Sequence, residues 1–159
     1  MERIQPDFGV SHSYRYIVDP DVVHYFDGNI INLHIALLPW NRGADPNLWS
    51  ALENTPSGVS IHVMTAGLDK GNILVQKELI LDDEETLQSS YDILQESMLE
   101  RFKESWADIR AGRLKGTPQD GSGSYHSLAD KKKYEHLLYV NGWQTKLRDI
   151  RGKALDQSE

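Results

Sequence analysis

Short apolar runs, separated by turn-forming and acidic residues, mark most of the first half of the chain. Runs at residues 8–13, 30–35, 59–64 and 72–81 have the length of β-strands, and β-branched residues are common in them. Residues 65–71 between the last two runs have the composition of a turn. The pattern therefore predicts four strands, of which the last two form a hairpin.

Helical signals occur at three places. Asp19 followed by Pro20 is typical of an N-cap and a first helical position, and predicts a helix over residues 21–26. A second short helix is expected at residues 47–53. Between residues 87 and 109 apolar side chains recur every three to four positions, which is the stripe of one long amphipathic helix. We expect this helix to pack on the sheet.

Length and composition limit the classes of protein that fit. The chain has 159 residues, about the length of one domain or of a piece of a larger one. Its 24 acidic and 17 basic residues give a net charge of −7, whereas a general nucleic-acid binder needs an excess of Lys and Arg. It has no cysteine, and no apolar run reaches the roughly 18 residues of a membrane span. We expect a cytoplasmic protein without membrane or nucleic-acid partners, with a domain at 1–150 and a flexible tail at 151–159.

Two polar residues interrupt the strand expected at residues 30–35. Asn32 and His34 are two positions apart, so both side chains point to the same face of the sheet. A buried polar group without a partner costs about 1–3 kcal/mol. Asp69 lies in the turn of the following hairpin. Taken alone, these residues also fit a structural hydrogen-bonded pair and a turn-forming aspartate, so both interpretations stay open.

Four ordered blocks carry a more specific signal. They read Asn-Leu-His-Ile-Ala-Leu-Leu-Pro at 32–39, Arg-Gly at 42–43, Gly-Val-Ser-Ile-His at 58–62 and Gly-Leu-Asp-Lys-Gly-Asn-Ile at 67–73. Their order and spacing resemble the formyltransferases that use 10-formyltetrahydrofolate, which act on methionyl-tRNA, glycinamide ribonucleotide or nucleotide-linked sugars.

The resemblance implies an α/β chain with a Rossmann-like formyltransferase fold. This chain resembles the C-terminal two thirds of the catalytic domain, truncated at the N-terminus. The strands that precede this part in the family would cover a sheet edge and apolar surface. A homodimer, or a partner chain that supplies the missing strands, is therefore expected.

The resemblance also implies roles for three residues. Asn32 would donate its amide to the oxyanion that forms on the formyl group. His34, held protonated by Asp69, would be a second donor, and Asp69 would pass protons through a water. No metal is implied, and a site built from His34, His62 and Asp69 lacks the tighter helical histidine pair of hydrolytic zinc sites. His62 is expected to be structural and to face the hairpin core.

Contacts to 10-formyltetrahydrofolate are implied for Tyr14, Arg15 and Tyr16, and for Leu38 and Pro39. Tyr14 to Tyr16 resemble the strip that lies along the folate in this family. The alternative is that these three side chains end a strand at the surface, where their apolar parts pack and their polar ends reach water.

Substrate contacts are implied for Trp40, Arg42 and Tyr125. Arg42 could steer an anionic substrate or brace its own loop. Tyr125 and His126 could form a lid over a nucleotide, or a packed loop in which the histidine is hydrogen-bonded.

Residues 38–50 and 123–126 look most like sugar N-formyltransferases that act on dTDP- or UDP-linked amino sugars for surface polysaccharides. We therefore expect an enzyme that moves a formyl group from 10-formyltetrahydrofolate to a nucleotide-linked amino sugar. The alternatives are a catalytically silent module, a half-enzyme that needs a partner chain, and a methionyl-tRNA formyltransferase. Members that act on methionyl-tRNA usually add a basic C-terminal domain.

Overall fold

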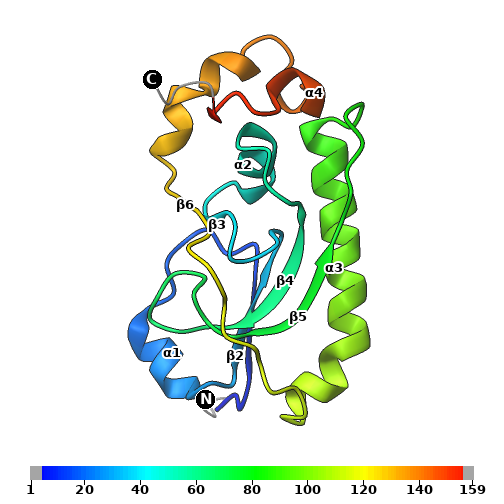
Figure 1. Cartoon of the computed structure of the whole chain (residues 1–159). Helices are drawn as coiled ribbons and strands as arrows, with labels where there is room; N and C mark the ends of the chain where they lie inside the picture. Colours follow the sequence, from blue (N-terminus) through cyan, green and yellow to red (C-terminus); the bar gives the residue numbers. More distant parts are fainter. Residues whose placement is uncertain (1–4, 156–159) are drawn as a thin grey trace.

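One mixed sheet forms the centre of the computed structural model, which describes residues 5–155. Its strands β1 (Gly9–His12), β2 (Ile30–His34), β4 (Gly58–Val63) and β5 (Ile73–Glu78) lie in the order β1-β2-β4-β5 (Figure 1). The β1–β2 pair is parallel, and the other two pairs are antiparallel. The four expected strands, their hairpin and the α/β class are confirmed.

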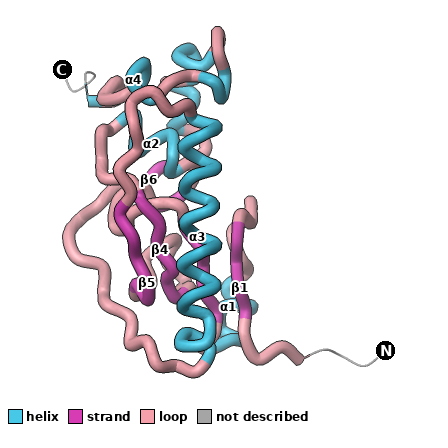
Figure 2. The backbone as a smooth tube through the Cα atoms, turned by 90° about the vertical axis from the view of Figure 1, so that its right-hand side faces the viewer, coloured by secondary structure: helices cyan, strands magenta, loops and turns pink. Residues whose placement is uncertain are grey.

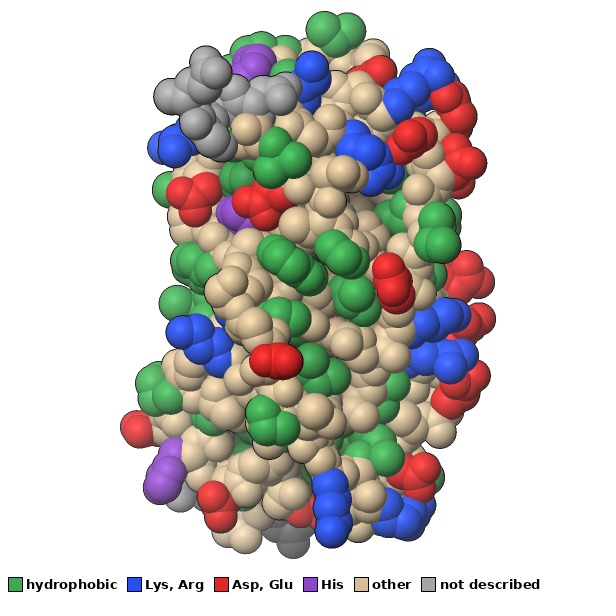
Figure 3. All heavy atoms as spheres, in the orientation of Figure 1, with side chains coloured by type: hydrophobic (Ala, Val, Ile, Leu, Met, Phe, Trp, Pro, Cys, Tyr) green, Lys and Arg blue, Asp and Glu red, His purple; other side chains and the backbone are tan. Residues whose placement is uncertain are grey.

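Helix α3 (Leu87–Arg110) lies across one face of this sheet, as Figure 2 shows. Leu94 and Met98 on its inner side are fully buried and pack with Ile31 of β2 and Ile61 of β4. The periodicity of the apolar residues is thus explained by a single contact between helix and sheet. Charged side chains of both signs follow the outer side of α3 (Figure 3). No helix within residues 5–155 has the length and apolarity needed to cross a membrane.

Helix α1 (Pro20–Phe26) begins as the sequence predicts. The carboxylate of Asp19 accepts a hydrogen bond from the amide of Asp21 at 2.9 Å, which satisfies one of the free amides at the helix start. The loop that leads from β1 to α1 starts at the carboxyl end of β1, which is also the carboxyl end of its parallel neighbour β2 (Figure 1). That edge of the sheet carries the polar residues of β2.

A second, smaller core lies beyond the sheet and forms around α2 (Pro46–Leu52) and α4 (Leu147–Ile150) (Figure 1). The chain between residues 127 and 140 contains two 3-10 helices, Asp130–Lys133 and Glu135–Leu138, and a third follows at Gly142–Gln144. The buried side chains of this core are Leu48, Trp49, Ala51, Leu52, Leu87, Tyr134, Leu147 and Ile150.

Residues 151–155, which were expected to belong to a flexible tail, lie against the end of α2 in the structure. The amides of Gly152 and Ala154 donate to the carbonyl oxygens of Ala51 and Leu52, both at 2.9 Å. These residues therefore pack along the end of α2 although few of them are apolar. The remainder of the expected tail, 156–159, lies outside the described residues.

Two very short strands form a separate parallel pair. They are β3 (Arg42–Gly43), inside the stretch that the sequence predicts to be a loop, and β6 (Tyr125–His126). Gly43 has a φ of +92°, and a Cβ there would collide with the carbonyl oxygen of His126. The close approach of the two strands therefore requires glycine at this position. The pair brings the segment that follows α3 back to the edge of the sheet where β2 ends.

Candidate active site

Three polar side chains meet at the end of the β2–β4 pair. Asn32 and His34 lie two positions apart on β2, and His62 of β4 is the register partner of Asn32. Directly paired residues on antiparallel strands place their side chains side by side on one face. The face that carries Asn32 and His34 therefore also carries His62, which is only 1% exposed.

Asp69 completes the cluster from the loop between β4 and β5. Its carboxylate accepts hydrogen bonds from Asn32 Nδ2 at 3.1 Å and from the amide of Gly43 at 2.9 Å. It also lies 3.3 Å from Nε2 of His62. Asp69 is 7% exposed. One buried carboxylate thus connects β2, β3 and β4.

His34 contacts Asp69 less closely than the sequence suggests. Its Nε2 donates to the carbonyl oxygen of Asn41 at 2.9 Å, which makes Nε2 the protonated nitrogen of the neutral ring. The other nitrogen, Nδ1, is 3.9 Å from Asp69 Oδ2, which is too long for a hydrogen bond. The structure brings the three predicted catalytic residues together, and their roles stay a prediction.

Both His34 and Asp69 have a pKa below its ordinary value, for different reasons. Removal from water lowers the pKa of His34, and the opposing effect of the Asp69 charge is smaller. Burial alone would raise the pKa of Asp69, but the positive charge that the His34 ring carries once it is protonated, the contact with His62 and the Gly43 amide outweigh it and hold that pKa well below its usual range. The lowered pKa of His34 favours a neutral ring at neutral pH, whereas the sequence led us to expect that Asp69 keeps this ring protonated. The low pKa of Asp69 favours an ionised carboxylate.

The contact of His62 with the carboxylate is the part of the site that sequence reasoning missed. Nδ1 of His62 lies 2.9 Å from the carbonyl oxygen of Val63, while Nε2 faces Asp69 and lies 3.5 Å from Asn32 Nδ2. The expected core position is confirmed, but the ring also belongs to the polar cluster. The strand pattern shows which face His62 occupies only once its pairing with Asn32 is known, and that register cannot be deduced from one strand alone.

The residues expected to contact folate fall into two groups. Leu38 and Pro39 line a cavity of about 460 Å³ together with residues 73–76 of β5 and residues 117, 118 and 120. Tyr14 and Tyr16 are 58% and 75% exposed, and their rings form an edge-to-face pair with centroids 5.8 Å apart. Tyr14, Arg15 and Tyr16 do not line that cavity. Their exposure agrees with the surface alternative, and a role of either group in folate binding stays a prediction.

Arg42 braces a loop, as one of the two alternatives predicts. Its Nε and Nη2 donate to Gln119 Oε1 at 3.0 and 2.8 Å, and its Nη1 donates to the carbonyl oxygen of Ser122 at 3.1 Å. Trp40 and Tyr125 are exposed, and Tyr125 is the register partner of Arg42 in the β3–β6 pair. A contact of Trp40, Arg42 or Tyr125 with the substrate stays a prediction.

His126 lies in a packed loop, as one alternative predicts, but its buried Nε2 makes no hydrogen bond. Its ring is stacked on Trp49 with centroids 3.7 Å apart and planes inclined by 6°, and its Nε2 is 3.1 Å from the carboxylate of Glu53. These residues, with Tyr125, Tyr134 and Lys133, line a cavity of about 270 Å³ next to α2.

Among residues 5–155, no group of three or more His, Cys, Asp or Glu side chains has a geometry that could hold a metal ion.

Several known proteins resemble this chain in sequence and in structure. A model of a family described as formyl transferase matches residues 1–104. The formyltransferase PseJ from Anoxybacillus kamchatkensis, solved in complex with UDP-4,6-dideoxy-4-formamido-L-AltNAc and tetrahydrofolate, is 49% identical, with a TM-score of 0.89 over 93% of this chain and 78% of that chain. A sugar N-formyltransferase from Shewanella sp FDAARGOS_354 is 27% identical, with a TM-score of 0.74 over 91% of this chain and 57% of that chain.

Curated relatives extend the same picture. A methionyl-tRNA formyltransferase from Clostridium botulinum is 30% identical over 151 residues, which cover 94% of this chain and 47% of the relative. The chain thus spans about half the length of the curated relatives it matches. The family match covers well over half of the chain and includes the positions of Asn32, His34 and Asp69. The chain therefore belongs to the formyl transferase family.

Proposed function

We propose that this chain transfers the formyl group of 10-formyltetrahydrofolate to the amine of a nucleotide-linked amino sugar. The cluster of Asn32, His34 and Asp69 carries the proposal, because the Asp69 carboxylate accepts from the Asn32 amide at 3.1 Å and lies 3.9 Å from the His34 ring. The 49% identity with a protein that was solved with a UDP-linked formamido sugar and tetrahydrofolate supports the choice of substrates. We also propose that the protein is cytoplasmic, because it has no cysteine and therefore needs no oxidising compartment to form disulfides.

The reaction replaces one carbon–nitrogen bond by another. The amine nitrogen of the sugar attacks the formyl carbon, and the carbonyl oxygen becomes an oxyanion in the tetrahedral intermediate. The bond from this carbon to N10 of the folate then breaks, and a proton that leaves the amine reaches N10. Asn32 has one amide hydrogen directed to Asp69, and its second faces His62 only at the long distance of 3.5 Å. That second hydrogen is available for the oxyanion, and one such donor contributes about 3–4 kcal/mol to stabilisation of the transition state.

His34 is the proton acceptor in this scheme. Its Nε2 is engaged with the carbonyl of Asn41, so its unprotonated Nδ1 takes the proton of the attacking amine and later delivers it to N10. Asp69 remains ionised, because its pKa is held low. Its charge, 3.9 Å from Nδ1, stabilises the imidazolium that forms during the reaction. This assigns the proton transfer to His34 and an electrostatic role to Asp69.

Formyl transfer to methionyl-tRNA is the second candidate. Its support is the set of curated relatives, which are methionyl-tRNA formyltransferases 30–35% identical to this chain. The net charge of −7 weighs against it, because tRNA binding relies on Lys and Arg at the phosphates.

One assay separates the candidates. The purified full chain is incubated with 10-formyltetrahydrofolate and with UDP- and dTDP-linked amino sugars, and in parallel with methionyl-tRNA. We expect one of the sugars, but not the tRNA, to gain the mass of one formyl group. The same sugar with its amine already acetylated is the matched control and should not change. Formylation of the tRNA alone would select the second candidate, and no product with either would favour a silent module or a chain that needs a partner.

A further inference from the structure

Gln119 lies next to the site but comes from a distant part of the chain, the segment after α3. Both ends of its side-chain amide are engaged. Nε2 donates to the carbonyl oxygens of Asp69 at 2.7 Å and Gly71 at 2.9 Å, while Oε1 accepts the two hydrogen bonds from Arg42. One side chain thus makes four hydrogen bonds, two of them to the loop that presents the Asp69 carboxylate.

The orientation of this amide is determined by its partners. A guanidinium group can only donate, so the oxygen of Gln119 must face Arg42. The nitrogen must then face the two carbonyl oxygens, which can only accept. Arg42 is itself fixed by the carbonyl oxygen of Ser122. The contacts therefore form an ordered series from Arg42 through Gln119 to the backbone of Asp69.

The backbone of Asp69 needs such support. Its φ is +51°, in the left-handed region that residues other than glycine adopt infrequently. A conformation of this kind persists only where surrounding contacts impose it. On one side of the residue the carboxylate is bonded to Asn32 and Gly43, and on the other the carbonyl is bonded to Gln119. The bonds of Gln119 therefore hold this residue independently of the carboxylate that the reaction uses.

We propose that Gln119 is a positioning residue of the formyl-transfer site, which keeps the Asp69 carboxylate against Asn32 and Gly43 by fixing the backbone of its loop. This inference rests on the proposed function for its catalytic consequence. The geometric part, that Gln119 holds the loop, is independent of what the enzyme transfers.

The first test uses Gln119→Glu. This variant keeps the size of the side chain and the acceptor for Arg42, but it replaces the two N–H donors by an oxygen that repels the carbonyls of Asp69 and Gly71. We expect kcat for the amino sugar to fall by about tenfold to a hundredfold, with KM changed by less than about threefold, because a small displacement of a reacting group acts mainly on the chemical step. Gln144→Glu makes the same chemical change at an exposed position of the Gly142–Gln144 helix and should leave both constants unchanged.

The second test measures amide hydrogen exchange in the full chain. In Gln119→Glu, we expect faster exchange in the segment 67–71 and at Gly43, whose amide is bonded to Asp69, while β4 keeps its protection. Faster exchange throughout the chain would indicate general destabilisation and would overturn the positioning role. Unchanged kcat in an active enzyme, or unchanged exchange in the segment 67–71, would also overturn it. If the wild-type chain formylates no substrate, the proposed function fails, and the exchange measurement still decides whether Gln119 holds the loop.

Discussion

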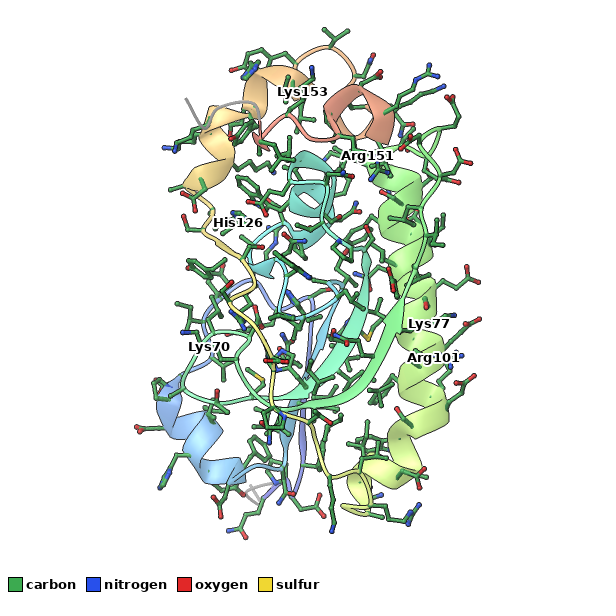
Figure 4. The ribbon with its side chains drawn as sticks, in the orientation of Figure 1. Lys70, Lys77, Arg101, His126, Arg151 and Lys153 are labelled. Atoms are coloured by element: carbon green, nitrogen blue, oxygen red, sulfur yellow. The ribbon has the colours of Figure 1, made fainter. Side chains whose placement is uncertain are left out.

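Within residues 5–155, histidine rings approach carboxylates at two separate places, and the shortest distance is not at the candidate site. His126 and Glu53 are 3.1 Å apart, whereas Asp69 lies 3.3 Å from His62 and 3.9 Å from His34. His126 is stacked on Trp49 of α2, and its backbone pairs with Gly43 of β3 (Figure 4). Short distance alone therefore does not mark a catalytic pair.

The two carboxylates differ in their other partners. Asp69 accepts from a side-chain amide and a backbone amide and contacts a second histidine, while its backbone is held by Gln119. Glu53 stands at the C-terminal end of α2 and faces one imidazole. Several donors that converge on one buried carboxylate fix its position and its charge, which is what a preorganised site requires. The comparison predicts that equal substitutions in the two pairs have unequal effects.

The largest difference is expected for the carboxylates. Asp69→Asn removes the charge that stabilises the imidazolium and replaces one of the two oxygens that accept from Asn32 and Gly43, so the oxyanion donor is displaced as well. We expect turnover of the amino sugar to fall by about a thousandfold. Glu53→Gln makes the same change in the other pair and should alter turnover by less than about twofold. Steady-state kinetics of the two variants measure this, and similar losses in both would remove the distinction between the pairs.

A smaller loss is expected for the histidine of the site. His34→Asn removes the proton acceptor, and we expect turnover to fall on the order of a hundredfold. His126→Phe keeps a ring on Trp49 and should leave turnover near that of the wild type. Single-turnover formylation assays measure both, and a fully active His34→Asn enzyme would exclude His34 as the proton acceptor.

The pH dependence of stability sharpens the comparison further. The folded state lowers the pKa of His34 below its ordinary value of 6.5, so in acid the unfolded chain binds a proton that the folded chain does not. The free energy of unfolding should therefore decrease as pH falls below 6.5, by at most about 1.4 kcal/mol per pH unit from this group. His34→Asn should remove that part of the slope in urea unfolding measured between pH 7.5 and 5.5. An unchanged slope would contradict the burial of a neutral ring.

Asp69 acts in a different range of pH. Its pKa is lower in the folded state than its ordinary 3.8, so its contribution to stability is complete above that value and is lost only as the pH falls below it. The two groups therefore act in separate intervals and can be distinguished in one titration.

The smallest effect is expected from Glu53→Gln on stability. The variant removes the charge that lies 3.1 Å from Nε2 of His126, and we expect a decrease of about 1 kcal/mol in the free energy of unfolding at neutral pH. Urea denaturation measures it. An increase in stability would show that the desolvation of Glu53 costs more than its pair with His126 contributes.

Local patterns were sufficient for most of the fold. The β-branched runs, the cap at Asp19 and the spacing of apolar residues in α3 each act within a few residues, and the corresponding strands and helices are present. The parts that sequence reasoning missed depend on pairing between distant segments. They include the β3–β6 pair, the packing of residues 151–155 on α2 and the contact of His62 with Asp69.

The candidate site shows the same division. The spacing of Asn32 and His34 places both on one face of a strand, and the resemblance adds Asp69. The protonation state of His34 could not be deduced in this way, because it depends on how much of the ring is removed from water. Gln119 gave no signal, since a glutamine in a loop has no distinctive spacing.

The return of the segment after α3 to the end of β2 has a kinetic consequence. The hydrogen bonds between Arg42 and Gln119 join residues 77 positions apart, and the bond from the Asn41 amide to Ser124 joins residues 83 positions apart. Contacts of this sequence separation require closure of long loops and form late in folding. During refolding, helix content should therefore return before the ability to transfer a formyl group does.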